Sequence, residues 1–119
     1  MIMELSENYQ NLITAIIKQA VVDYRKSRLY LQKHPKTDEL VETAKWQTEH
    51  RKRQQEKRRQ KGLPPIPEKR GKEEEMLTRI LRAEHMLQDT VRFFRSDWFY
   101  ALADIDGEVL LRRLEEEFE

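Results

Sequence analysis

Hydrophobic residues recur at helical spacing near the start of the chain. A proline at position 35 ends the pattern, because the residue before a proline is pushed out of helical angles. We therefore predict one long helix from an N-cap at Ser6 to about residue 33. The apolar positions that carry this prediction are Tyr9, Leu12, Ile13, Ile16, Ile17, Ala20, Tyr24 and Leu31.

A second helical pattern follows an acidic run at Glu73–Glu75, which favours a helix start. Its apolar positions are Met76, Leu77, Ile80, Leu81, Leu87, Val91, Phe94 and Trp98. Ser96 is expected to stop this helix and to start a short aromatic one ending near Ala103. A last helix is predicted over 106–118. Because no long stretch alternates with a period of two, we predict an all-α fold, a small helical bundle.

Aromatic residues gather between Phe93 and Leu111, a stretch that holds most of the phenylalanines in a chain otherwise rich in charge. Aromatic side chains bury the largest apolar area per residue, so we predict the core here. The expected hub consists of Phe94, Trp98, Phe99 and Leu102. We predict that Trp98 is buried against the first helix near Ile16 or Ala20.

The middle of the chain begins as an amphipathic helix and then loses its apolar face. Thr37 is the expected N-cap, and Trp46 is expected to close the apolar face. Residues 47–61 contain no large apolar residue but are good helix formers, which favours a projecting helix. The prolines within Gly62–Gly71 predict the longest irregular stretch. We thus expect a single domain over 1–119, with a basic arm and a proline-rich loop at 47–72 projecting from it as a helical hairpin.

Charge is strongly segregated along the chain, although the net charge is only +1. Residues 45–72 hold eleven Lys or Arg and three Glu, about +8, so the remainder carries about −7. Much of that negative charge lies at Glu115–Glu117 and Glu119. We interpret this acidic end as a solvated helix end, or as a partner or competitor for the basic arm.

The basic arm is the candidate binding site, because dense Lys and Arg suit contacts with phosphates along a duplex or a structured RNA. The residues proposed for nucleic-acid or partner binding are Arg51, Lys52, Arg53, Lys57, Arg58, Arg59 and Lys61. No aromatic residue stands between these charges, so the sequence does not indicate a platform for stacking single strands. No leucine zipper follows the arm, which argues against a basic-zipper protein.

The sequence offers little for catalysis. Cysteine is absent, and no two of the three histidines are three or four residues apart, as ligands on one helix face would be. The segment Asp104–Glu108 superficially resembles a calcium loop, but Leu102 and Arg113 stand at the first and twelfth positions, where such a loop needs carboxylates, so we interpret it as a helix-capping turn. We therefore expect no catalytic residue, cofactor, metal or small-molecule substrate, and no enzymatic activity. The apolar runs are too short for a membrane span.

Two segments resemble a known family. The pattern Phe93-Phe94-Arg95-Ser96-Asp97-Trp98-Phe99, with Asp104-Ile105-Asp106-Gly107-Glu108 after it, is similar to small proteins encoded in phages and prophages of Gram-positive bacteria. The segment 19–26 resembles the N-terminal helix of that family. The resemblance covers about half of the chain, its two ends, and the relatives join these parts by a shorter link. It implies an accessory protein acting in the bacterial cytoplasm, and it assigns no catalytic residue.

Together these observations predict a phage accessory protein that acts by binding nucleic acid or a host nucleoprotein. One alternative is an inhibitor of a host defence protein, comparable to an anti-CRISPR protein, acting through protein–protein contact. Another is a structural part of a phage replication or packaging complex. The apolar width of the first helix also predicts a homodimer, formed by the first helix and the C-terminal helices.

Overall fold

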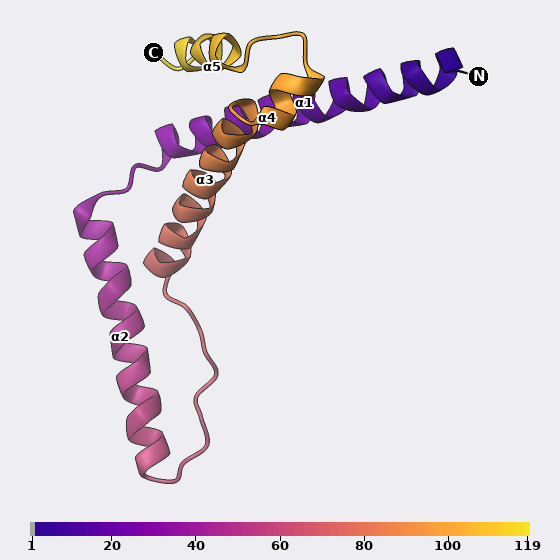
Figure 1. Cartoon of the computed structure of the whole chain (residues 1–119). Coiled ribbons are helices and arrows are strands. Elements are labelled where there is room, and N and C mark those ends of the chain that lie inside the picture. The colour runs from indigo at the N-terminus through magenta and orange to yellow at the C-terminus, as the bar shows by residue number, and fades with distance from the viewer. Residues whose placement is uncertain (1) are drawn as a thin grey trace. The chain divides into compact units, whose positions relative to one another are not determined.

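The computed structural model describes residues 2–119, with side chains described from residue 7 onward, and these residues form five α-helices and no strand. The helices are α1 (Ile2–Lys33), α2 (Asp38–Gln60), α3 (Lys72–Phe94), α4 (Asp97–Leu102) and α5 (Gly107–Glu116), as labelled in Figure 1. The predicted all-α class and the long N-terminal helix are confirmed. The helix begins before Ser6, so the expected N-cap at that residue is wrong.

The chain divides into two compact units. The first, here called the core unit, contains Met1–Lys33 and Ala83–Glu119, and the second, the arm unit, contains His34–Arg82. Helix α3 contributes its first part to the arm unit and its second part to the core unit. The predicted arm at 47–72 lies within the arm unit, and a single domain over 1–119 stays a prediction.

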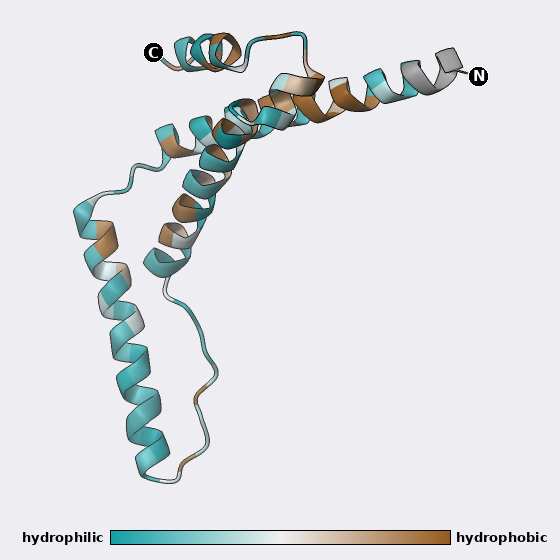
Figure 2. Ribbon diagram, in the orientation of Figure 1, coloured by the Kyte–Doolittle hydropathy of each residue, from teal (hydrophilic) through white to brown (hydrophobic). Residues whose placement is uncertain are grey.

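Hydropathy differs between the helices. Figure 2 shows apolar positions recurring on α1, α3 and α5, whereas α2 is hydrophilic along most of its length. Because each helix of the core unit carries one apolar stripe, it packs that stripe against its neighbours. Within residues 2–119, no helix has the combination of length and apolar character that crossing a bilayer requires.

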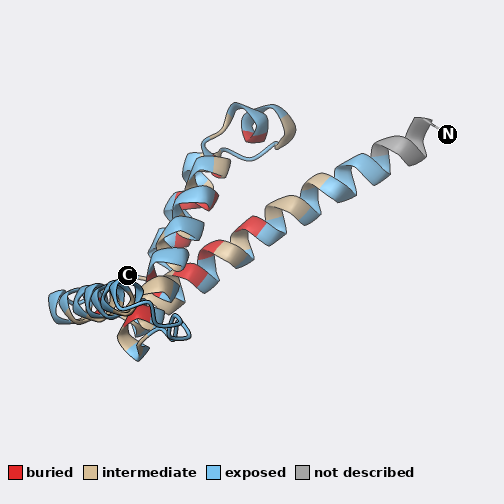
Figure 3. Cartoon of the chain, turned by 90° about the horizontal axis from the view of Figure 1, so that it is seen from below, coloured by how far each residue is buried: buried red, intermediate tan, exposed pale blue. Residues whose placement is uncertain are grey.

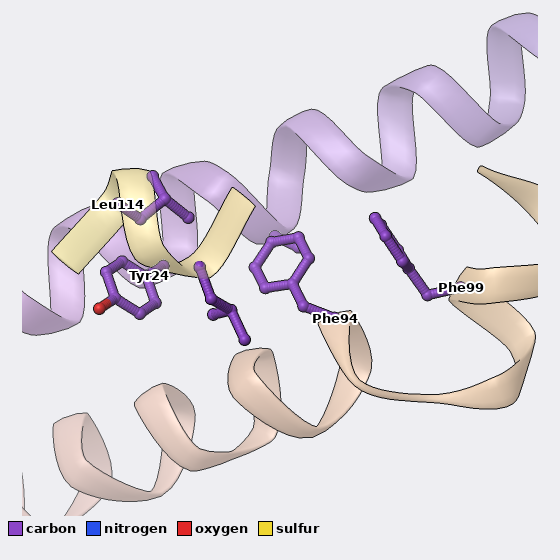
Figure 4. Close-up of a cluster of buried hydrophobic side chains, with 6 residues drawn as sticks. Tyr24, Phe94, Phe99 and Leu114 are labelled. Carbon is purple, nitrogen blue, oxygen red and sulfur yellow. The ribbon is translucent and has the colours of Figure 1, made fainter. Parts of the chain in front are cut away.

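Side chains from all four helical segments of the core unit form its hydrophobic core. The buried cluster comprises Ala20 and Tyr24 of α1, Phe94 of α3, Phe99 of α4, and Leu111 and Leu114 of α5. Figure 4 shows four of these side chains meeting between the helices. In Figure 3 the buried positions of α1 recur along the helix with exposed positions between them.

The aromatic hub is confirmed for two of its four predicted members. Phe94 and Phe99 are each 2% exposed, and their rings meet edge to face at 5.5 Å. Trp98 is 51% exposed, so the prediction that it is buried is wrong. Helix α4 is only six residues long and turns Phe99 inward, which directs the preceding side chain away from the core. Trp98 and the half-buried Leu102 instead line the edge of the core beside Ile16.

The two interruptions near the C-terminus are capping turns. Ser96 Oγ accepts a hydrogen bond from the backbone N–H of Phe99 at 3.1 Å, and Asp106 Oδ1 accepts one from Glu108 at 2.9 Å. Each of these hydrogen bonds satisfies a backbone N–H group in the first turn of a helix, where no partner is available within the helix. Gly107 is required here, because a Cβ atom would overlap the carbonyl oxygen of Phe94. The interpretation of this segment as a capping turn is confirmed.

The acidic C-terminus is tied to α1. The guanidinium of Arg25 donates two hydrogen bonds to the carboxylate of Glu117, at 2.7 and 2.9 Å. The guanidinium of Arg28 lies over the ring of Phe118, 5.5 Å from its centroid. These contacts hold the end of the chain against α1, while Glu115, Glu116 and Glu119 stay exposed.

Candidate functional site

Helix α2 carries the predicted binding residues, and both of its ends are well defined. The side chain of Thr37 accepts a hydrogen bond from the backbone of Leu40 at 3.1 Å, which confirms it as the N-cap. At the other end Gly62 has a φ of 70°, a conformation that glycine adopts without strain. Gly62 donates to the carbonyl of Arg59 and Leu63 to that of Arg58, the pattern of a Schellman motif.

The proline-rich loop after α2 turns back and runs beside the helix (Figure 1). The side chain of Gln55 bonds both backbone groups of Ile66: it accepts from the N–H at 3.1 Å and donates to the carbonyl. Arg58 Nε donates to the carbonyl of Pro64 at 2.8 Å. Because prolines lack an N–H, Ile66 offers one of the few donors in this segment. Polar side chains of α2 therefore hold the loop.

Glu74, in the first turn of α3, is the most enclosed charged group of the arm unit. Its carboxylate accepts from Arg51 Nη2 at 2.7 Å, from Thr48 Oγ1 at 2.8 Å and from the backbone of Gly71 at 3.1 Å. The side chains of Glu74 and Arg51 are 7% and 22% exposed. The hydrogen bonds from the Arg51 guanidinium hold the pKa of Glu74 down at about 2, although burial acts in the opposite direction.

Helix α3 is capped from α2. Gly71 holds the N-cap position of α3 but has no side chain that could accept a hydrogen bond. The side-chain oxygen of Gln47 accepts one instead, from the backbone N–H of Glu74 at 3.2 Å. Glu74 reaches back to the N–H of Gly71, as the third residue of a capping box does. A Cβ atom at Gly71 would overlap the side chain of Gln47, so glycine makes room for this cap.

These contacts form a polar seam, defined by Gln47, Thr48, Arg51, Gln55 and Arg58 of α2 and by Glu74. The seam was not predicted, and it changes the roles of two candidate binding residues. Arg51 and Arg58 face inward and are used in holding the loop and α3. A signal was present in the sequence: the seam positions of α2 recur every three or four residues, as an apolar stripe would.

The other five predicted binding residues remain on the surface, and they form what we call the basic surface: Lys52, Arg53, Lys57, Arg59 and Lys61. Arg53 lies 3.9 Å from Glu49, and Arg59 lies 3.2 Å from Glu56. Exposed pairs of this kind contribute little and leave both arginines available. The three lysines make no ion pair with any described side chain. The loop adds exposed Lys69 and Arg70.

The prediction that Trp46 closes the apolar face of α2 is wrong. Trp46 is 61% exposed, because it lies about 200° around the helix from the buried Ala44. Its ring stacks on that of His50, with the centroids 4.8 Å apart and the planes 8° from parallel. An exposed flat aromatic pair therefore lies immediately before the basic surface.

The loop leaves a depression on each side of the polar seam. A cleft of about 290 Å³ lies on the side of Trp46 and His50, and Ile66, Pro67 and Lys69 line its other wall. A wider groove of about 990 Å³ lies on the side of Lys52, Arg59 and Arg70. Both depressions are formed entirely by residues of the arm unit. Cations thus line the wider one together with the carboxylates of Glu56 and Glu68, and aromatic and apolar groups line much of the smaller.

Comparisons with protein-family models, with curated proteins and with solved structures give no match to this chain. The resemblance to phage and prophage proteins stays a prediction. Among the described residues, no three histidine, aspartate or glutamate side chains gather closely enough to hold a metal ion. The candidate site is therefore the surface of the arm unit.

The core unit also leaves apolar side chains at its surface. Tyr9 and Leu12 of α1 are exposed, and a groove of about 400 Å³ beside Ile16 is lined by Met86 and Phe93. This surface lies partly on α1, one of the helices expected to form the homodimer; the C-terminal helices were the other expected contributors. The homodimer stays a prediction, which light scattering of the purified chain would test.

Proposed function

We propose that this chain is a binding protein, a phage accessory protein whose basic surface contacts nucleic acid, alone or within a nucleoprotein. One observation carries the proposal. Arg51 and Arg58 take part in the polar seam, and five other cations remain exposed between Lys52 of α2 and its C-cap Lys61. The three lysines make no ion pair with a described side chain, and the exposed pairs of Arg53 and Arg59 are weak, so all five are available to phosphate groups.

The dimensions of this stretch suit the proposal. Nine residue steps along a helix span about 14 Å, and duplex DNA carries one negative charge for about every 1.7 Å of its axis. Several phosphates therefore lie within reach of the five side chains. The groove beside Lys52 and Arg59 adds one further cation, Arg70, although Glu56 and Glu68 also line it. Contacts with phosphates position a protein without selecting a sequence, so we expect weak binding with little sequence preference.

The test compares two variants with the same change in charge. In the first, Lys52, Arg53, Lys57 and Arg59 are replaced by Gln, which is a good helix former and leaves Arg51 and Arg58 in place. In the matched control, the exposed Lys18, Lys26, Arg112 and Arg113 of the core unit are replaced by Gln. Affinity for a labelled oligonucleotide is measured over a series of salt concentrations.

For the parent chain we expect the logarithm of affinity to fall with the logarithm of salt concentration, by about 0.9 per phosphate contact on duplex DNA. The arm variant should bind more weakly and show a flatter dependence, and the control variant should bind as the parent does. Equal losses in both variants would mean that only the total charge matters. An arm variant that binds as the parent does would refute the proposal.

A second candidate function is inhibition of a host defence protein through protein–protein contact. Trp98 and Tyr100 of α4 favour it, since they are 51% and 86% exposed and such residues are enriched where proteins bind one another. Capture of the same host protein with and without nuclease treatment would support this function if Tyr100→Ala abolishes the capture. Loss of the captured protein on nuclease treatment would favour the nucleic-acid function.

A further inference from the structure

The smaller cleft of the arm unit has two walls of different origin. One wall is the stacked pair Trp46 and His50, one helical turn apart on α2. The other consists of Ile66 and Pro67 of the proline-rich loop, which Gln55 holds in place through its two hydrogen bonds with Ile66. The cleft is thus an open slot between the stacked aromatic pair and an apolar segment of the loop, and the polar seam holds that segment in place.

The chemistry of this slot matches an unpaired nucleobase. A base has a flat face that stacks on an aromatic ring, whatever its identity. In a duplex both faces of a base are already covered by its neighbours, whereas a single strand leaves them free. The side chain of Gln54 also lines the slot and makes no hydrogen bond to any described residue, so its amide is free to bond a base edge.

The cations of α2 continue from the slot in a line. Arg53 and Lys57 follow His50 at intervals of three and four residues, which keeps them on the same side of the helix as the aromatic pair. One helical turn advances about 5.4 Å, close to the spacing of successive phosphates on an extended strand. Lys69 adds a cation on the opposite wall of the slot.

We propose that the slot beside Trp46 and His50 binds a base of single-stranded nucleic acid, whose backbone then follows Arg53 and Lys57. This inference rests on the proposed function and names its substrate class. It departs from the expectation of contacts along a duplex or a structured RNA, which rested on the absence of aromatic residues between the charges. Folding places Trp46 on the outer face of the same helix, where it supplies the missing stacking surface.

The test compares a strand of about 20 nucleotides, longer than the site size of a small single-strand-binding domain, with the duplex of the same sequence. Affinities are measured for the parent chain, Trp46→Ala and Trp46→Phe. We expect Trp46→Ala to lose roughly tenfold in affinity for the single strand, the effect of losing one stacked base, with no change for the duplex. Trp46→Phe retains a flat ring and should retain most of the affinity. Tyr100→Ala, which removes the most exposed aromatic residue of the core unit, should change neither affinity.

A second measurement needs no destabilising change at the slot. In a Trp98→Phe background the remaining tryptophan fluorescence comes from Trp46. Stacking of a base on the indole should quench this fluorescence when the single strand is added, and the duplex should leave it unchanged. This fluorescence measurement tests the stacking site even if the Trp46→Ala substitution perturbs the helix.

The outcomes separate the two proposals. If strand and duplex both bind with steep salt dependence, but neither Trp46→Ala nor the fluorescence responds to the strand, the stacking site is refuted and the basic surface stands. If neither nucleic acid binds at low salt, the proposed function itself is refuted. If a free mononucleotide at equal concentration displaces the strand, the slot binds nucleotides rather than strands, which also refutes the inference.

Discussion

The core unit and the arm unit are both built from helices, but they differ in the balance of apolar and polar contacts that holds each together. In the core unit, six buried apolar residues from four helical segments form one cluster. In the arm unit two apolar residues, Ala44 and Ile80, are buried, and hydrogen bonds made by Gln47, Arg51, Gln55 and Arg58 of α2 hold the loop and the start of α3. Apolar burial depends little on pH or salt, whereas buried polar groups stabilise only while every partner is present. The two units should therefore respond to different perturbations.

The largest effect is expected in the core unit. Phe94 is almost fully buried and contacts Phe99, so Phe94→Ala should lower the free energy of unfolding by about 3–5 kcal/mol. Trp98→Ala, which removes a larger but half-exposed side chain, should cost about 1 kcal/mol. Urea unfolding followed by circular dichroism measures both. Equal costs would contradict the division between buried and surface aromatic residues.

A smaller effect is expected in the arm unit. Glu74→Gln leaves the guanidinium of Arg51 without its carboxylate, and we expect a cost of about 1–3 kcal/mol. The matched control is Glu56→Gln, which removes an exposed partner of Arg59 and should cost at most about 0.5 kcal/mol. Proteolysis of the loop at 62–71, compared between the two variants, reports the opening of this unit. Identical cleavage rates would mean that the polar seam does not hold the loop.

The same contrast explains what the sequence predicts well. The helical class and the burial of Phe94 and Phe99 follow from apolar residues at helical spacing, because burial is non-directional and a periodic stripe finds a partner. Burial of Trp98 was wrongly predicted, because a helix of six residues turns only one side to the core. Periodicity identifies the face of a helix but not how much of that face the neighbouring helices cover.

Periodicity could not predict which residues pair in the polar seam. Gln47 and Glu74 are 27 residues apart, and Gln55 and Ile66 are 11 apart. Nothing in the local pattern selects those partners from the many other polar residues nearby. For the same reason the basic arm was treated as uniformly exposed, although Arg51 and Arg58 face inward. Trp46 is exposed because it follows the buried Ala44 by two residues and so lies on the other side of α2.

The claim that a polar seam around Glu74 stabilises the arm unit is tested most directly by lowering the pH. The pKa of Glu74 is about 2 in the folded chain, below its ordinary value of 4.5, so its stabilisation is fully present above pH 4.5 and is lost as the pH falls toward 2. The pKa of Glu117 in the core unit is also lowered, by the hydrogen bonds from Arg25, but that pair is exposed and contributes little.

Amide NMR spectra recorded from neutral pH down to about pH 2 follow both units at once. The account predicts that the signals of Gly71, Glu74 and the α2 residues of the seam lose their native positions between pH 4.5 and about 2, while those around Phe94 and Leu114 keep theirs. Loss of both sets at the same pH, or native seam signals throughout, would contradict it.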